Sequence, residues 1–190
     1  MPTSARAPGP TGIVLAVSGR RIDADGADQP RFPAANEALV AQRIRDRMVF
    51  TAAETLVCSG ACGVDILALE AAAELGLGCR LVLPFARGQF RAGSVADRGE
   101  EWGRRFDAIL QQLASEDIVE LNLQQSTTEA YAAANYTILD QAEALAAGAG
   151  SRVLAMVVWN GLSRGPTDLT DQFRKIAVDR KLEVIPVSTL

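Results

Sequence analysis

Apolar residues along this chain fall into short continuous runs, which alternate with longer segments where apolar and polar positions are mixed. Runs of branched aliphatic residues predict buried strands, whereas apolar positions that recur at helical spacing predict helices. The predicted strands cover residues 13–18, 55–59, 79–83, 117–121, 153–159 and 182–187. The predicted helices cover residues 34–50, 64–75, 100–113, 128–147 and 169–180.

Strands and helices alternate along the chain, and the last predicted element is a strand. Strands with continuous apolar runs are typical of a parallel sheet that helices cover on both faces. Because crossovers between parallel strands are right-handed, we expect an α/β fold, a Rossmann-like doubly wound three-layer sandwich with a mostly parallel sheet of about six strands. We expect residues 12–190 to form a single domain and residues 1–11 to be a disordered lead.

Composition narrows the chemistry that such a fold can support. The chain has 190 residues, of which 48% are apolar and 22% are charged, as expected for a folded domain with a full core. It contains no histidine, which excludes a Ser-His-Asp triad, a Cys-His pair and a histidine-ligated metal site. Acid–base catalysis would need carboxylates, tyrosine, cysteine or lysine. The net charge of −4 disfavours nonspecific binding to nucleic acid.

The cysteines and the N-terminal residues bear on metals and on compartment. Cys58, Cys62 and Cys79 cannot complete a zinc site without histidine, so we expect no metal. We expect Cys58 and Cys79 to pack as small apolar residues and Cys62 to be more exposed. An odd number of cysteines, no secretion signal and no apolar run long enough to cross a membrane predict a cytoplasmic protein.

The turn between the second strand and the second helix is the sharpest candidate for a ligand site. Doubly wound sheets bind ligands beyond the carboxyl ends of their strands. Gly60 and Gly63 permit a tight turn from Ser59 through Ala61 and expose backbone amides at a helix N-terminus, an arrangement that binds phosphate. Asp65 in the first helical turn can accept a hydrogen bond from a ligand hydroxyl. The same residues also fit a purely structural turn with a capping aspartate.

Loops after the first, third and fifth strands are expected at the same edge of the sheet. They carry several arginines, whose guanidinium groups suit phosphate or carboxylate. The expected ligand-binding residues in these loops are Ser18, Gly19, Arg20, Arg21, Arg87, Arg91, Asn160, Arg164, Gly165 and Thr167. Each of these loops also fits a solvated connection without a ligand.

Three strand ends resemble those of the SLOG superfamily. They read Ser18-Gly19, then Ser59-Gly60-Ala61-x-Gly63-x-Asp65, and finally Leu83-Pro84-Phe85. That superfamily unites the DNA-processing DprA/Smf proteins, the LOG nucleotide hydrolases and ligand-sensing domains of bacterial conflict and signalling systems. The resemblance covers about residues 12–188. Further points of likeness are Asn135, Trp159-Asn160-Gly161, Gly165-Pro166-Thr167, Asp171 and Ala177.

The chain departs from the LOG enzymes at their catalytic motif, P-G-G-x-G-T-x-x-E. Here Pro166 breaks the double glycine, and no glutamate stands at the catalytic position. The resemblance therefore implies a sensor-type domain that binds a nucleotide or nucleotide-derived phosphorylated signal in bacterial defence or stress signalling. It implies no catalytic residue and no required cofactor.

Two alternatives to the sensor remain open. The first is a LOG-like nucleotide N-glycosidase or phosphoribohydrolase, with Asp171 or Asp65 as the working carboxylate. The second is a DprA-like scaffold associated with single-stranded DNA, which the net charge disfavours. As partners we expect a small nucleotide and either a second copy of the chain or an effector protein, with neither a membrane nor nucleic acid.

Overall fold

The computed structural model describes residues 12–124 and 128–190, so the lead expected over residues 1–11 lies outside the described residues. Six strands form one sheet in the order β4-β3-β2-β1-β5-β6. The strands are β1 (Ile13–Gly19), β2 (Ala53–Cys58), β3 (Gly78–Leu83), β4 (Ile118–Glu120), β5 (Arg152–Trp159) and β6 (Glu183–Ser188). The helices are α1 (Glu37–Phe50), α2 (Val64–Leu75), α3 (Arg87–Phe90), α4 (Glu100–Gln112), α5 (Thr128–Ala149) and α6 (Leu169–Asp179).

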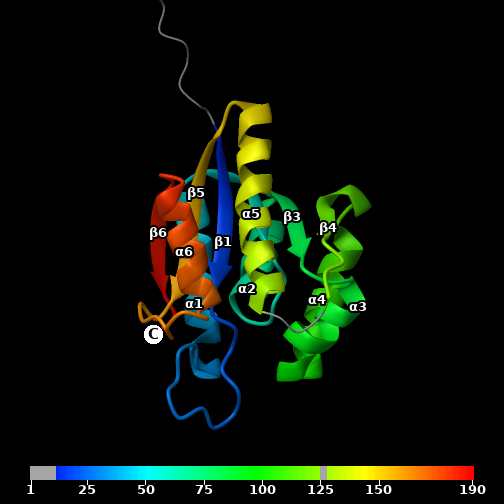
Figure 1. Ribbon diagram of the computed structural model, residues 1–190, viewed down its shortest axis with the longest axis vertical. Coiled ribbons are helices and arrows are strands. Elements are labelled where there is room, and N and C mark those ends of the chain that lie inside the picture. The colour runs from blue at the N-terminus through cyan, green and yellow to red at the C-terminus, as the bar shows by residue number, and fades with distance from the viewer. Residues whose placement is uncertain (1–11, 125–127) are drawn as a thin grey trace, which may run out of the picture.

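Every pair of neighbouring strands in this sheet is parallel. Helices cover both of its faces, with α5 and α6 in front and α1 and α2 behind in the view of Figure 1. The expected Rossmann-like three-layer α/β fold is therefore confirmed, and the sheet is entirely parallel. None of the described helices is long and apolar enough to cross a membrane.

The alternation of side chains along β1 explains the two layers of helices. Leu15 and Val17 pack into the core shared with α1, α2 and α4. Val14 and Ala16 point to the opposite face and pack against α5 and α6. Successive side chains of a strand face opposite sides of a sheet, so a strand that is apolar at every position needs both layers.

The order of the strands reverses between β1 and β5. The chain builds β1 to β4 outward on one side, and α5 then returns it to the other side of β1, where β5 pairs in register. Both strands run toward the lower end of the molecule in Figure 1, where the loop of residues 20–33 follows β1. In doubly wound sheets this reversal opens the crevice that takes ligands.

The connection after β3, expected as a loop from Phe85 to about Asp97, is helical, so this prediction is wrong. Residues 85–97 are not an extended loop, because α3 is followed there by a short π-helical turn, Arg91–Val95, and a 3-10 turn, Ala96–Arg98. The segment folds onto the domain through buried Phe90, whose ring lies 5.9 Å from that of Phe106 on α4. Burial of two apolar anchors, Phe90 and Val95, overrides the local preference of a segment with two glycines.

Candidate ligand-binding cavity

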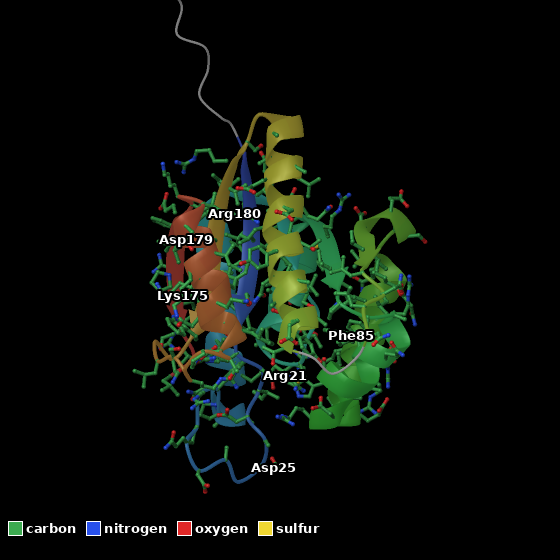
Figure 2. The ribbon with its side chains drawn as sticks, viewed as in Figure 1. Arg21, Asp25, Phe85, Lys175, Asp179 and Arg180 are labelled. Atoms are coloured by element: carbon green, nitrogen blue, oxygen red, sulfur yellow. The ribbon has the colours of Figure 1, made fainter. Side chains whose placement is uncertain are left out.

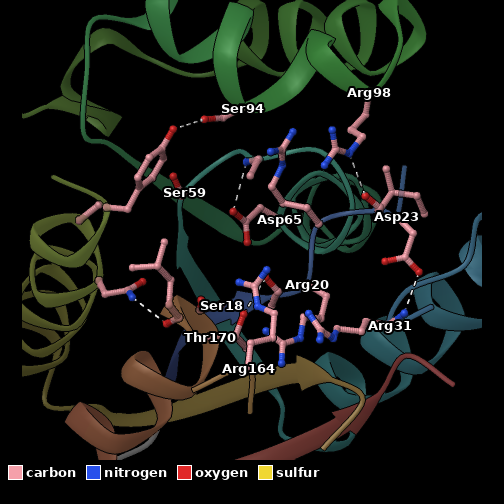
Figure 3. A pocket seen from close by; sticks show the side chains of 18 of the residues that line it. Ser18, Arg20, Asp23, Arg31, Ser59, Asp65, Ser94, Arg98, Arg164 and Thr170 are labelled. Atoms are coloured by element: carbon pink, nitrogen blue, oxygen red, sulfur yellow. Dashed lines mark hydrogen bonds between the residues drawn. The ribbon is translucent and has the colours of Figure 1, made fainter. Parts of the chain in front are cut away.

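A cavity of about 520 Å³ opens at the carboxyl end of β1. Its wall is made by five parts of the chain that are far apart in sequence (Figure 3). They are the end of β1 with the loop after it, the β2–α2 turn, the helical segment 90–98, one face of α5, and Arg164 with the start of α6. The cavity therefore lies where the strand order reverses, which is the position expected for a ligand site.

The predicted site residues divide into two groups. The residues that line the cavity are Ser18, Gly19, Arg20, Arg21, Ser59, Ala61, Asp65 and Arg164. The residues that do not line it are Gly60, Gly63, Arg87, Arg91, Asn160, Gly165 and Thr167.

The loop after β1 interlocks with the β2–α2 turn. The Ile22 amide donates to the Cys62 carbonyl at 3.3 Å, and the Val64 amide donates to the Arg20 carbonyl at 3.2 Å. Gly63 has a φ of +100°, and a Cβ there would lie 2.5 Å from the Ile22 nitrogen. Gly63 is therefore required by the packing of two protein loops, without reference to a ligand.

The expected phosphate cradle in this turn is wrong for three of its amides. The Ala61 amide donates to the Asp65 carboxylate at 3.1 Å, and the Cys62 amide donates to the Ser94 carbonyl at 3.0 Å. The Val64 amide is bound to Arg20, as described above. A Cβ on Gly60 would lie 2.8 Å from the ring of Phe106, so that glycine also serves packing. These amides are held by partners that local sequence does not reveal.

Asp65 lines the cavity but is only 8% exposed. Burial raises the pKa of its carboxyl to about 7, against the opposing effects of the Ala61 amide and the Arg21 guanidinium. A carboxyl with a pKa near neutrality in a cavity is a frequent mark of a functional site. Within the described parts of the chain, no cluster of His, Cys, Asp or Glu side chains is placed to hold a metal ion.

Arg20 reaches the cavity wall, but its charge is already paired. Its Nη1 lies 2.7 Å from the Oδ1 of Asp168, and both side chains are almost fully buried. Its Nη2 donates to the Leu162 carbonyl at 2.6 Å, and its Nε donates to the Oδ1 of Asn160 at 3.3 Å. Arg20 thus lines the cavity, as expected, but its guanidinium donates to protein groups, and Asn160 serves to hold Arg20.

Asp168 joins this ion pair to the start of α6. Its Oδ1 accepts from the amides of Thr170 and Asp171, which caps the helix, and its Oδ2 accepts from the Arg164 amide at 2.8 Å. Burial alone would raise the pKa of this carboxyl, but the hydrogen bonds from Arg20 and the amides hold it well below its ordinary range. Arg20 and Asp168 thus fasten the loop of residues 160–168 to β1.

Arg21 is paired in a similar way. Its Nη2 donates to the Asp97 carboxylate and, at 3.2 Å, to the Cys62 sulfur. Cys62 is fully buried, so the expectation that it is more exposed is wrong. It is buried because its turn forms a backbone bridge with the loop after β1, through Arg21 and Gly63.

Two cavity arginines, Arg31 and Arg98, were not expected from the sequence. Arg31 follows directly after the loop residues 24–30. The Asp23 carboxylate fixes this part of the loop by accepting from the amides of Arg31 and Phe32 at 2.7 and 2.8 Å. Arg98 lies in the 3-10 turn before α4, 3.3 Å from an oxygen of Asp97. The fold of these two segments brings the arginines to the cavity, and no local pattern in the sequence signals it.

The two arginines expected after β3 point elsewhere. Arg87 pairs with Glu120 of β4 at 2.6 Å. Arg91 pairs with Glu100 and, at 2.8 Å, with Asp107. They leave the cavity because their segment is helical and turns these side chains toward β4 and α4. The expectation that both arginines face the ligand edge of the sheet is therefore wrong.

The far end of the 160–168 loop and Asp171 also lie off the cavity. Gly165 and Thr167 are exposed and contribute nothing to its wall. Asp171 is bound by Arg174 and, at 2.9 Å, by Lys175, which lies on α6 away from Arg21 (Figure 2). Of the two carboxylates considered for hydrolysis, only Asp65 therefore reaches the cavity.

The wall opposite these loops is built by α5, which sequence reasoning did not connect to the site. The Tyr131 hydroxyl and the Ser94 hydroxyl form a hydrogen bond of 2.9 Å, and the Tyr131 ring meets that of Phe85 edge to face. Asn135 is buried and donates to the Leu169 carbonyl at 2.9 Å, which ties α5 to α6. An aromatic ring and two hydroxyls thus line one side of the cavity.

The geometry defines a Rossmann-like α/β protein with an arginine-lined cavity at the reversal of its strand order. A scan against models of known protein families finds no match, and a search of curated proteins finds no similar sequence. Neither comparison supports the resemblance to the SLOG superfamily, which therefore stays a prediction.

Proposed function

We propose that the cavity binds a nucleotide or a nucleotide-derived phosphorylated signal. The observation that carries this proposal is the charge of the cavity wall. Among the described residues, five arginines and two aspartates line it, in a chain whose net charge is −4. Asp168 and Asp97 behind the wall pair with Arg20, Arg21 and Arg98, so the unbalanced positive charge lies mainly on Arg31 and Arg164. Guanidinium groups bind phosphate through paired, charge-assisted hydrogen bonds. The excess of arginine at this one place favours a compact anion over a long polyanion.

The size and position of the cavity also support a nucleotide. A volume of about 520 Å³ lies within the range of small-molecule sites, roughly 300 to 1,000 Å³. The Ser94 and Tyr131 hydroxyls can hydrogen-bond a sugar or a base, and the Tyr131 ring offers an aromatic edge. The SLOG-like strand ends favour a sensor in bacterial defence or stress signalling, acting with an effector or a second copy of the chain.

A thermal-shift screen tests this proposal. The panel contains nucleoside mono- and diphosphates, NAD, ADP-ribose, cyclic dinucleotides and a short single-stranded DNA. A ligand at about a hundred times its Kd stabilises the native state by about 2.7 kcal/mol. For a domain of this size that corresponds to a rise in Tm of about 5 to 10 °C.

Two matched variants locate the binding. Gln29 and Gln89 are both exposed, but only Gln29 lines the cavity. Gln29→Trp should abolish the thermal shift by filling the cavity mouth, whereas Gln89→Trp should leave it unchanged. The proposal is wrong if no nucleotide raises the Tm of the wild type, or if Gln29→Trp keeps the full response.

A nucleotide N-glycosidase is the second candidate, and Asp65 is the observation that favours it. A buried carboxyl with a pKa of about 7 can donate or accept a proton near neutral pH. Incubation with nucleoside monophosphates and NAD should then release free base, and Asp65→Asn should stop the release. No release at high protein concentration excludes this activity for the nucleotides tested.

A further inference from the structure

The arginines of the cavity are not equally neutralised. Asp168 lies 2.7 Å from Arg20 but 3.6 Å from the Nε of Arg164. Arg31 has no ion pair or side-chain hydrogen bond from its guanidinium to any described residue. Arg164 and Arg31 are therefore the cavity arginines with the most charge left to satisfy.

These two side chains line the same cavity from different loops. Figure 3 shows the Arg31 side chain extending from its loop toward the part of the cavity where Arg20 and Arg164 lie. Ser59 and Ser94 lie on the other side of the same view, whereas Thr170 lies beside Arg164. Arg20 and Arg164 share the Asp168 carboxylate, but Arg31 does not. The guanidinium of Arg31 is therefore repelled by the other two unless an anion lies between them.

The backbones that carry the two arginines are fixed, while their side chains are not. The Asp23 carboxylate holds the Arg31 amide at 2.7 Å, and the Asp168 carboxylate holds the Arg164 amide at 2.8 Å. The Arg164 side chain is still 45% exposed. Asp23 and Asp168 thus fix the backbone of each arginine, and the guanidinium groups keep donors available to a ligand.

We propose that Arg31 and Arg164 form a two-armed clamp for a phosphoryl group. The nucleoside part of the ligand then lies toward Tyr131 and the Ser59 and Ser94 hydroxyls. This inference rests on the proposed function, because it assigns the orientation of the ligand in the same cavity. It also assigns a ligand role to Arg31, which no sequence motif marked. The shared chemistry is a phosphate dianion, whether free or carried by a nucleotide.

Titration calorimetry with two kinds of probe tests the clamp. Inorganic pyrophosphate reports on the phosphoryl site alone, and the ribonucleoside monophosphates report on the whole cavity. We expect Arg31→Gln and Arg164→Gln each to lower the affinity for both kinds of probe by about tenfold or more. Circular dichroism and Tm establish that each variant is folded.

Arg45 is a close control for Arg164. Its side chain is 42% exposed, and its Nε lies 3.6 Å from Glu74, on α1 outside the cavity. Arg45→Gln removes the same charge and the same kind of long ion pair. We expect it to change the affinities less than about twofold.

The outcomes separate the clamp from the proposed function. If nucleotides bind the wild type and both cavity variants equally well, the clamp is wrong and the nucleotide site stands. If pyrophosphate binds and depends on both arginines while no nucleotide binds, the clamp stands as an anion site and the proposed function is wrong. If neither kind of probe binds the wild type, both are wrong.

Discussion

Replacement of Asp65 by asparagine should change how stability depends on pH. The substituted amide would keep the shape of the side chain and an oxygen to accept from the Ala61 amide, but it cannot ionise. In the wild type, burial raises the pKa of this carboxyl from 3.8 to about 7. The folded protein therefore prefers the protonated carboxyl, whereas the unfolded chain ionises at the ordinary pKa.

The sign follows from proton binding. Below about pH 4 the carboxyl is protonated in both states, so it adds no pH dependence. As the pH rises from about 4 to about 7, only the unfolded chain releases its proton, and the free energy of unfolding falls. Above about pH 7 the loss is complete. At about 1.4 kcal/mol for each tenfold change in proton affinity, the gap from 3.8 to about 7 amounts to at most about 4 kcal/mol.

Urea denaturation followed by circular dichroism measures this effect. The difference in unfolding free energy between Asp65→Asn and the wild type should be small near about pH 4 and reach a few kcal/mol by about pH 8. Asp25 is exposed in the loop after β1, so Asp25→Asn removes the same charge from solvent and should follow the wild-type curve. A difference for Asp65→Asn that stays constant across this pH range would refute the reasoning.

Two further predictions concern the packing that positions the cavity. Arg20→Met leaves the fully buried Asp168 carboxylate without its cation and should lower the free energy of unfolding by about 3 to 5 kcal/mol, as measured in urea; a loss below about 1 kcal/mol would mean that the pair is not a fastening contact. Gly63→Ala should lower the Tm more than Gly26→Ala does. Both glycines have positive φ, but a Cβ at residue 63 meets the Ile22 nitrogen at 2.5 Å, whereas nothing lies within 4 Å at residue 26. Equal losses of Tm would contradict this.

The layers of the fold were predictable because their signal is local. Apolar runs and helical periodicity each depend on neighbouring residues, and the parallel sheet follows from their alternation. Even the short strand β4 fell within its predicted range. The prediction for residues 85–97 was wrong because the signal there is not local. The helical turns are stabilised by burial of Phe90 against Phe106, which lies on a distant helix.

Only the part of the candidate site that lies at the carboxyl ends of strands could be predicted from the sequence. Ser18 lies at the end of β1, Ser59 and Asp65 follow β2, and parallel strands bring their carboxyl ends to one edge. Tyr131 could not be found this way, because it lies on the helix that returns the chain across the sheet. Nor does the sequence separate a paired arginine from a free one: Arg20 and Asp168 meet across 148 positions of the chain.

Hydrogen–deuterium exchange with the nucleotide that gives the largest thermal shift tests most directly whether this cavity is the binding site. At saturation, exchange should slow in the segments that carry cavity residues, 18–31, 94–98, 131–138 and 169–170, and at Arg164. It should not change in residues 43–50 and 183–188, where α1 and β6 border a separate groove. Protection confined to that groove, or saturated binding with no protection around the cavity, would contradict the proposed site.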